Sequence, residues 1–265
     1  MKKILIIGST GMLGRTMEKY FKLEGYIVSV LNRKDLDLSL CSWSELEDKI
    51  VGSDCGVVIN CAGLIVQRKD TPTEDFLMVN SIIPRWLANI CEKQNIELYH
   101  PTTDCIYDGL KGPYEEGEPY TETGVYGVSK ALGEPNNCTV IRSSIIGEEK
   151  HNKLSFLEWV RNNAGNTING YTNHLWNGVT CLEMCKIIAE IIKSDTYFKG
   201  TKHYYSPTVT KFDMINYVNE IYGLGITVNS VSTGVVIDKS LSSKYTVCRK
   251  DLHEQIKEQK NFWDE

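Results

Sequence analysis

Short apolar segments recur along the first half of this chain and predict five strands. The first of them is unbroken, rich in β-branched side chains and only four residues long. A run of that kind is typical of a strand buried on both faces in the middle of a parallel sheet. The predicted strands are residues 4–7, 26–31, 55–60, 96–101 and 138–143.

Segments with the apolar spacing of helices lie between these strands, at residues 12–23, 42–51 and 74–94. Ser42 with Glu45 three residues later forms the capping box that begins a helix. Pro84 lies inside the third segment, where we expect it to kink or divide the helix. Strands that alternate with helices predict an α/β fold of the Rossmann type, a doubly wound parallel sheet with helices on both faces.

The second half of the chain is less regular. Helical patterns are present at residues 151–163, 182–193, 206–222 and 251–262. We therefore expect residues 1–148 to form a Rossmann domain and residues 149–265 to form mainly a small C-terminal lobe. Part of residues 170–205 is expected to return to the first domain.

Composition narrows the classes of protein that fit. The chain has 265 residues, of which 42% are hydrophobic, and a net charge of -5 without a block of like charges. This argues against nucleic-acid binding and against attraction to an anionic membrane. Nine cysteines occur without a C-x-x-C pair, so neither a disulfide framework nor a zinc site is indicated. No apolar run is long enough to span a bilayer, and the first residues form a strand rather than a signal peptide. We expect a cytoplasmic protein.

The most informative motif is the glycine-rich loop after the first strand. Gly8, Gly11 and Gly14 are spaced three residues apart and lead into the first helical pattern. Unpaired backbone N–H groups and the helix dipole at such a junction bind phosphate, and missing side chains let a pyrophosphate approach. The spacing resembles that of the short-chain dehydrogenase/reductase superfamily, in particular its extended, sugar-nucleotide branch. The loop residues predicted to bind the cofactor are Gly8, Thr10, Gly11, Met12, Leu13 and Gly14.

The end of the second strand predicts which dinucleotide binds. An acidic residue there accepts a hydrogen bond from the adenosine 2′-OH, whereas a basic residue accommodates a 2′-phosphate. Asn32 and Arg33 follow the strand here. We therefore predict that Arg33 binds the 2′-phosphate of NADPH, with NADH as the alternative cofactor. Asp37 and Leu38 resemble the pair that lies against adenine in this superfamily.

Two further segments match the superfamily around the cofactor. Cys61, Ala62 and Gly63 follow Asn60 and resemble the N-x-A-G segment that lies along the nicotinamide-side ribose and the diphosphate. Asn80 resembles an asparagine that supports the active site in related helices, although a polar residue facing solvent would give the same pattern.

Tyr126 and Lys130 supply the predicted chemistry. Residues four apart on a helix share a face, so the two side chains project together. A phenol titrates at about 10, and a neighbouring ammonium stabilises the phenolate and lowers that pKa. The same ammonium can hydrogen-bond the nicotinamide ribose, while Thr103, after the fourth strand, can hydrogen-bond a carbonyl oxygen. This set predicts ketone reduction, with hydride from the nicotinamide and a proton from Tyr126.

The loop after the fourth strand allows a finer assignment. Its sequence, T-T-D-C-I-Y-D-G, resembles the S-T-D-x-V-F-x-G stretch of dTDP-4-dehydrorhamnose reductases. Related dehydratases carry Asp-Glu after the threonine, whereas this chain has Asp104 and Cys105, which disfavours dehydration. The resemblance implies an NADPH-dependent reductase of a nucleotide-linked 4-keto-6-deoxy sugar, in surface polysaccharide biosynthesis.

Two alternatives remain open. GDP-fucose synthases use a cysteine two positions after the catalytic hydroxyl residue for epimerisation, and Cys105 occupies that position. They also need a histidine, for which His151 and His174 are the candidates. The dehydrorhamnose reductase-like family also includes a non-catalytic NADP-binding regulatory subunit. The intact set of Thr103, Tyr126 and Lys130 argues against that function.

The remaining expectations concern the substrate and the assembly. The nucleotide sugar is expected to contact Thr103, Asp104, Cys105, Asn173 and Trp176. Residues 113–123 are expected to form a flap over it. Few residues separate Lys130 from the fifth strand, so the catalytic helix must be short, and the protein is expected to be a monomer or a homodimer. Some dehydrorhamnose reductases use Mg²⁺ at a dimer contact, but no equivalent acidic cluster is present, so no metal is predicted.

Overall fold

The computed structural model describes residues 2–65, 71–150, 153–245 and 247–265. It divides into two compact units, which we call the first unit and the second unit. The first comprises Met1–Thr102, Glu122–Arg142 and Cys185–Lys202, and the second comprises Thr103–Thr121, Ser143–Met184 and His203–Glu265. The loop after the fourth strand was expected in the first domain, which was predicted to span residues 1–148, but in the structure it belongs to the second unit. The segment that returns to the first unit is residues 185–202.

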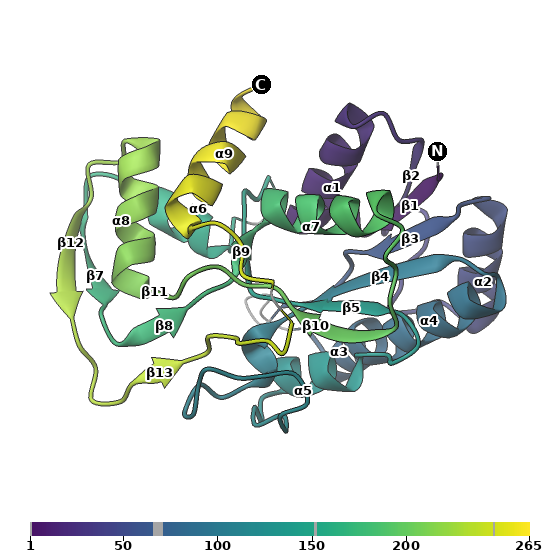
Figure 1. Cartoon of the computed structure of the whole chain (residues 1–265), viewed down its shortest axis with the longest axis horizontal. Helices are drawn as coiled ribbons and strands as arrows, with labels where there is room; N and C mark the ends of the chain where they lie inside the picture. The colour runs from purple at the N-terminus through teal and green to yellow at the C-terminus, as the bar shows by residue number, and fades with distance from the viewer. Residues whose placement is uncertain (1, 66–70, 151–152, 246) are drawn as a thin grey trace. The chain divides into compact units, whose positions relative to one another are not determined.

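The first unit is built on a six-stranded sheet of order β10-β5-β4-β3-β1-β2 (Figure 1). The strands β1 to β5 pair in parallel, which confirms the predicted doubly wound sheet. All four residues of β1 are buried, as the unbroken apolar run predicts. The strand bounds are β1 Ile4–Ile7, β2 Val28–Leu31, β3 Val57–Asn60, β4 Glu97–Thr102, β5 Thr139–Arg142 and β10 Gly200–His203.

Helices cover both faces of this sheet. Helices α2 (Trp43–Gly52) and α4 (Ile83–Lys93) bury Leu46, Leu87 and Ile90 against the strands in one apolar cluster. Helix α1 (Met12–Leu23) lies with α7 (Cys181–Lys193) on the opposite side of the sheet (Figure 1). The capping box predicted at Ser42 and Glu45 is present.

The long helical pattern at residues 74–94 is divided, as Pro84 predicts. Helix α3 (Thr73–Leu77) continues into a π-helical turn, η1 (Met78–Ile82), and then into α4. Pro84 stands in the first turn of α4, directly after the π turn, and without an N–H it cannot donate to the carbonyl of Asn80, four residues earlier. The wider π turn contains two buried polar residues, Asn80 and Ser81, which matter for the site described below.

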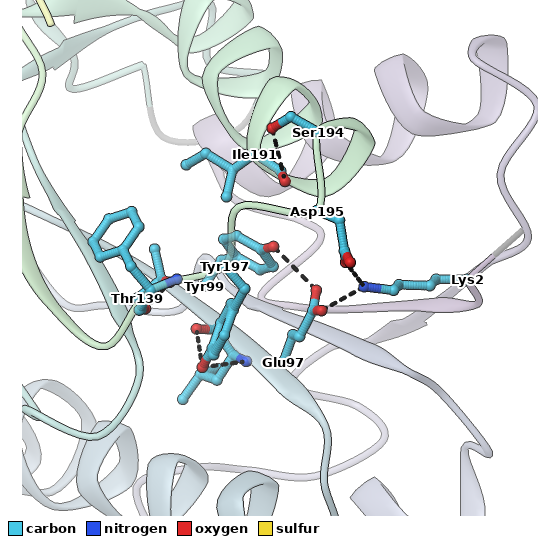
Figure 2. Close-up of polar contacts among 10 residues, drawn as sticks. Lys2, Glu97, Tyr99, Thr139, Ile191, Ser194, Asp195 and Tyr197 are labelled. Atoms are coloured by element: carbon cyan, nitrogen blue, oxygen red, sulfur yellow. Dashed lines mark hydrogen bonds and ion pairs between the residues drawn. The ribbon is translucent and has the colours of Figure 1, made fainter.

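The returning segment is fastened to the sheet by side chains (Figure 2). The Tyr197 hydroxyl lies 3.3 Å from the Leu98 backbone nitrogen, which donates to it, and its ring packs edge-on against Tyr99. Lys2 forms ion pairs with Glu97 and with Asp195, the latter at 3.4 Å. Thr139 donates to the backbone of Phe198 and accepts from its N–H at 3.3 Å. These contacts hold residues 185–202 in the first unit.

The second unit has three small sheets, of order β6-β9, β7-β12 and β11-β8-β13. Its apolar core joins Leu157, Trp176, Met214 and Ile256 with six other buried side chains. The element bounds are β6 Ile145–Ile146, α6 Phe156–Arg161, β7 Thr167–Tyr171, β8 His174–Trp176, β9 Val179–Thr180, β11 Val209–Thr210, α8 Lys211–Tyr222, β12 Thr227–Val231, β13 Ile237–Asp238 and α9 Leu252–Asp264.

Two sequence predictions were wrong in this unit. The helix expected from residue 206 begins at Lys211, because Thr210 caps it with Asp213 and β11 pairs with β8 just before it. The helix expected at 151–163 is limited to α6, capped by Ser155, and residues 151 and 152 lie outside the described residues.

None of the helices formed by the described residues is both long and apolar enough to cross a membrane.

Candidate active site

The glycine loop is a place where backbone packs directly on backbone. Gly8 has a φ of +79°, and a Cβ there would lie 2.8 Å from Ala62. A Cβ at Gly14 would lie 2.2 Å from the carbonyl oxygen of Gly8, which no side chain can tolerate. Both glycines are therefore required for the loop to turn tightly between β1 and α1. The N-x-A-G segment predicted from the sequence is the surface against which Gly8 packs.

An open pocket of about 770 Å³, a volume that includes its mouth, lies at the end of β1 and β3. Its walls contain most of the residues predicted to bind a dinucleotide: Gly8, Thr10, Gly11, Asn32, Arg33, Asp37, Leu38, Cys61, Ala62 and Gly63. Met12, Leu13 and Gly14 are not among its lining residues, since Leu13 and Gly14 are buried in α1. Leu36, Ser39, Leu64, Asp75 and Val79 also line it and were not predicted.

Arg33 and Asp37 form an ion pair at one end of this pocket, with Nε 2.9 Å from Oδ2. Burial alone would raise the pKa of Asp37, but hydrogen bonds from Ser39 and Arg33 hold that pKa below its usual value. The Arg33 side chain is 66% exposed, so its remaining N–H groups can reach an anion in the pocket. This position suits the predicted contact with a 2′-phosphate.

Helix α5 (Val125–Leu132) carries Tyr126 and Lys130 and is short, as predicted. Asn80 of η1 holds this helix in position through hydrogen bonds. The Asn80 amide donates to the Ser129 hydroxyl at 3.1 Å and to the Leu64 carbonyl at 3.1 Å, while its oxygen accepts from the Leu64 N–H at 2.9 Å. At the end of α5, a Cβ on Gly133 would lie 1.8 Å from the Asn80 carbonyl oxygen. Asn80 is thus a buried positioning residue, as the superfamily pattern predicts, and not a solvent-facing one.

Lys130 is buried next to the N-x-A-G segment. A Cβ on Gly63 would lie 3.8 Å from its Nζ. His100 of β4 is also fully buried, and burial together with the Lys130 charge holds its pKa well below the usual value. The His100 Nδ1 lies 3.2 Å from the Asn60 amide nitrogen, and its Nε2 has no hydrogen-bond partner among the described residues. His100 is therefore a neutral imidazole beside Lys130, which the sequence did not single out.

Thr103 directly follows the last residue of β4 and belongs to the second unit. It caps the 3₁₀ turn η2 (Asp104–Ile106), accepting from the Cys105 N–H at 3.1 Å. Its hydroxyl donates to Asp104 Oδ1 at 3.2 Å. A hydroxyl has one proton, so donation to a substrate carbonyl would replace this bond to Asp104.

Cys105 lies beside the same carboxylate, with Sγ 3.5 Å from Asp104 Oδ1. Burial, reinforced by Asp104, raises the pKa of the Cys105 thiol to about 12. The thiol is therefore protonated at neutral pH and is a poor general base. Of the two candidate histidines for an epimerase, His174 is hydrogen-bonded to Thr233 at 3.0 Å, and His151 lies outside the described residues.

The other predicted substrate residues have structural partners. Asn173 donates to the carbonyls of Thr233 and Val235 and accepts from the Thr233 N–H. Trp176 is buried in the core of the second unit. The segment predicted as a flap is anchored, because Tyr114 is buried and stacks on Tyr107 with ring centroids 4.0 Å apart. As ligands of a substrate, Asn173 and Trp176 stay predictions.

The chain resembles known proteins over much of its length. Residues 1–167 match the family model of the RmlD substrate binding domain. A dTDP-4-dehydrorhamnose reductase of Aggregatibacter actinomycetemcomitans is 29% identical over 231 residues, which cover 80% of this chain and 76% of that protein. One of Streptomyces griseus is 31% identical over 132 residues, 49% of this chain and only 43% of that protein.

The fold also matches solved structures. That of a dTDP-4-dehydrorhamnose reductase from Bacillus anthracis, in complex with NADP, superimposes with a TM-score of 0.83 at 18% identity. The match covers 98% of this chain and 99% of that one. At this identity the likeness establishes the fold alone, and it confirms the Rossmann-type architecture predicted from the sequence.

Proposed function

The chain belongs to the RmlD substrate binding domain family, and on that premise we propose that it is an NADPH-dependent reductase of a nucleotide-linked 4-keto-6-deoxy sugar in surface polysaccharide biosynthesis. One observation carries the proposal. The glycine-loop pocket has Arg33 in its wall, and the same unit buries Lys130 beside the N-x-A-G segment, four residues after Tyr126 on α5. A pocket for a phosphorylated dinucleotide and a tyrosine–lysine pair of this kind suit hydride transfer to a ketone.

Each residue has a defined part in the proposed reaction. NADPH, when bound, supplies the hydride. Lys130 stabilises the Tyr126 phenolate and hydrogen-bonds the cofactor, so that Tyr126 can give a proton to the new alkoxide at neutral pH. Thr103 gives up its bond to Asp104 and donates to the substrate carbonyl oxygen instead. Asn80 and Ser129 keep α5 in place during turnover.

Ligand binding tests the proposal first. Thermal unfolding would be followed with NADPH, NADH, dTDP, UDP, GDP and CDP, since a ligand that binds only the folded state raises the melting temperature. We expect a larger shift with NADPH than with NADH, and a shift with one nucleotide. Turnover of the matching 4-keto sugar should fall about 100-fold or more in Tyr126→Phe, with NADPH binding unchanged. An NADPH shift without any response to a nucleotide would contradict the sugar-nucleotide substrate and favour the regulatory subunit.

The epimerase alternative is tested by Cys105→Ser. Because the pKa of the Cys105 thiol is raised to about 12, we expect simple reduction to survive this change. Exchange of substrate carbon-bound hydrogen with deuterated water would reveal epimerisation. Exchange that the wild type shows and Cys105→Ser loses would establish the alternative.

A further inference from the structure

His100 lies in β4, an inner strand of the first unit's sheet, next to the asparagine that begins the N-x-A-G segment. Strands β3 and β4 pair in parallel with Ile59 opposite Tyr99, so the next residues, Asn60 and His100, stand side by side. Their exposed fractions are 1% and 0%. The Asn60 Nδ2 lies 3.2 Å from the His100 Nδ1. A hydrogen bond between two buried side chains thus joins β4 to the end of β3.

A backbone contact of Asn60 decides the direction of this hydrogen bond. The Asn60 Oδ1 accepts from the Ala62 N–H at 3.2 Å. A backbone N–H can only donate, so the amide oxygen must face Ala62 and the amide nitrogen must face His100. Burial holds the pKa of His100 well below its usual value, so the ring is neutral and its Nδ1 lone pair can accept. His100 therefore supplies the acceptor that keeps the Asn60 amide in this orientation.

Ala62, at the far end of these two hydrogen bonds, belongs to the wall of the glycine-loop pocket. Its backbone nitrogen and Cα are the atoms nearest to a Cβ placed on Gly8, both at 2.8 Å, so the glycine loop packs directly on them. Cys61 and Gly63, on either side of Ala62, line the same pocket. A displacement of the Ala62 backbone would therefore change the shape of the pocket where the cofactor is proposed to bind.

The neighbours of this alanine are held by other groups. The Cys61 N–H donates to the Ile7 carbonyl at 2.9 Å. The Leu64 N–H and carbonyl are both bound by Asn80. These contacts fix the N-x-A-G segment before and after the alanine, and the Asn60 side chain holds the N–H of the alanine itself.

We propose that His100 is a positioning residue for cofactor binding, which accepts from Asn60 and thereby keeps the Ala62 N–H, and with it the pocket wall, in the shape that binds NADPH. The proposal rests on the proposed function, because it takes the glycine-loop pocket to be the NADPH site. His100 acts through Asn60 and Ala62 and does not itself touch the cofactor. Without an acceptor at position 100, the Asn60 amide is free to turn, and its oxygen then leaves the Ala62 N–H.

The experiment compares His100→Leu and His100→Phe with His100→Gln. Leucine and phenylalanine remove the acceptor with side chains of different shape, whereas glutamine keeps an acceptor for Asn60. Tyr99→Phe is the matched control. Tyr99 is equally buried in β4, points to the other face of the sheet, and also loses one hydrogen bond, which its hydroxyl donates to Glu97 at 3.1 Å. Titration calorimetry would measure the NADPH affinity, and urea unfolding would measure the stability of each variant.

We expect the dissociation constant of NADPH to rise about 10-fold in His100→Leu and in His100→Phe, which is the contribution of about one hydrogen bond. His100→Gln and Tyr99→Phe should keep the wild-type affinity. Asn60→Ala should weaken NADPH binding as His100→Leu does. The double variant should lose no more than Asn60→Ala alone, because His100 acts through Asn60.

Three results would overturn the proposal. One is wild-type NADPH affinity in His100→Leu or His100→Phe; since the two differ in shape, either one that folds decides. Another is a loss in His100→Gln as large as in His100→Leu, because glutamine keeps the acceptor. The third is an equal loss in Tyr99→Phe, which would assign the effect to general destabilisation. The proposed function fails differently, by a wild-type protein that does not bind NADPH.

Discussion

The glycine loop of the first unit and the second unit hold distant parts of the chain together in different ways. In the first unit, the glycine loop joins the N-x-A-G segment through backbone contacts, with Gly8 against Ala62 and Gly14 against the Gly8 carbonyl. In the second unit, side chains bind backbones far away in the sequence. The Asn177 amide donates to the Leu241 carbonyl at 2.7 Å and accepts from the Leu241 N–H at 2.8 Å. Glu116 likewise accepts from the His203 N–H at 2.7 Å and from the Ser243 hydroxyl at 2.6 Å.

This difference explains why the glycine loop is easier to interpret from its sequence than most of the second unit. Close backbone approach requires the smallest residues at fixed spacing, so it leaves a motif that is visible without a structure. A single asparagine or glutamate that binds a backbone 64 or 87 residues away leaves no local pattern. The glycine loop and the segment it packs against therefore have a recognisable sequence, whereas the second unit has one mainly in the loop that begins at Thr103.

Gly14→Ala should give the largest effect on stability. The new methyl group would lie 2.2 Å from the Gly8 carbonyl, and backbone cannot move aside as a side chain can. We expect the free energy of unfolding to fall by about 3 kcal/mol, with weakened NADPH binding. Urea unfolding measures the free energy of unfolding, and titration calorimetry measures the NADPH affinity. Gly52→Ala is the control, since a Cβ at Gly52 would meet nothing within 4 Å. Equal stability of the two variants would show that the backbone contact is not a constraint.

Asn177→Ala tests the side-chain fastening of the second unit. The change removes two hydrogen bonds and leaves the N–H and carbonyl of Leu241 buried without this partner, which should cost about 2 kcal/mol. Urea unfolding would be compared with that of Asn229→Ala, whose side chain is exposed. We expect NADPH affinity to stay at the wild-type value. A loss of NADPH affinity as large as that of Gly14→Ala would show that Asn177 also supports cofactor binding, and would contradict this prediction.

His100→Gln should change the pH dependence of stability and little else. The pKa of His100 is lowered in the folded protein, so below about pH 6.5 the unfolded chain binds a proton that the native state does not. Stability should therefore fall as the pH drops from 7 to 5, by up to about 1.4 kcal/mol per pH unit. Glutamine keeps an acceptor for Asn60 and does not titrate, so this variant should show a flatter profile. If stability fell with pH as steeply in His100→Gln as in the wild type, His100 would not be the source of the pH dependence. The same conclusion would follow if the surface variant His253→Gln lost the dependence.

The extent of prediction from sequence follows the same division. In the first unit, α1 was predicted residue for residue, and the strands were placed to within about two residues. In the second unit, the helix expected from residue 206 begins at Lys211. The reason is that residues 209 and 210 pair with β8, which is distant in the chain, and a local capping box of Thr210 with Asp213 begins the helix after them.

The sequence by itself determined the parallel sheet, the glycine loop, the tyrosine–lysine pair on a short helix and the family to which the chain belongs. Each of these depends on residues that are close together in the chain, so the composition and spacing of one segment suffice to reveal it. Only the tertiary structure decided that Asn80 fastens α5 and that His100 is neutral beside Lys130. Burial and electrostatic environment are sums over neighbours from many segments, and folding alone brings those neighbours together.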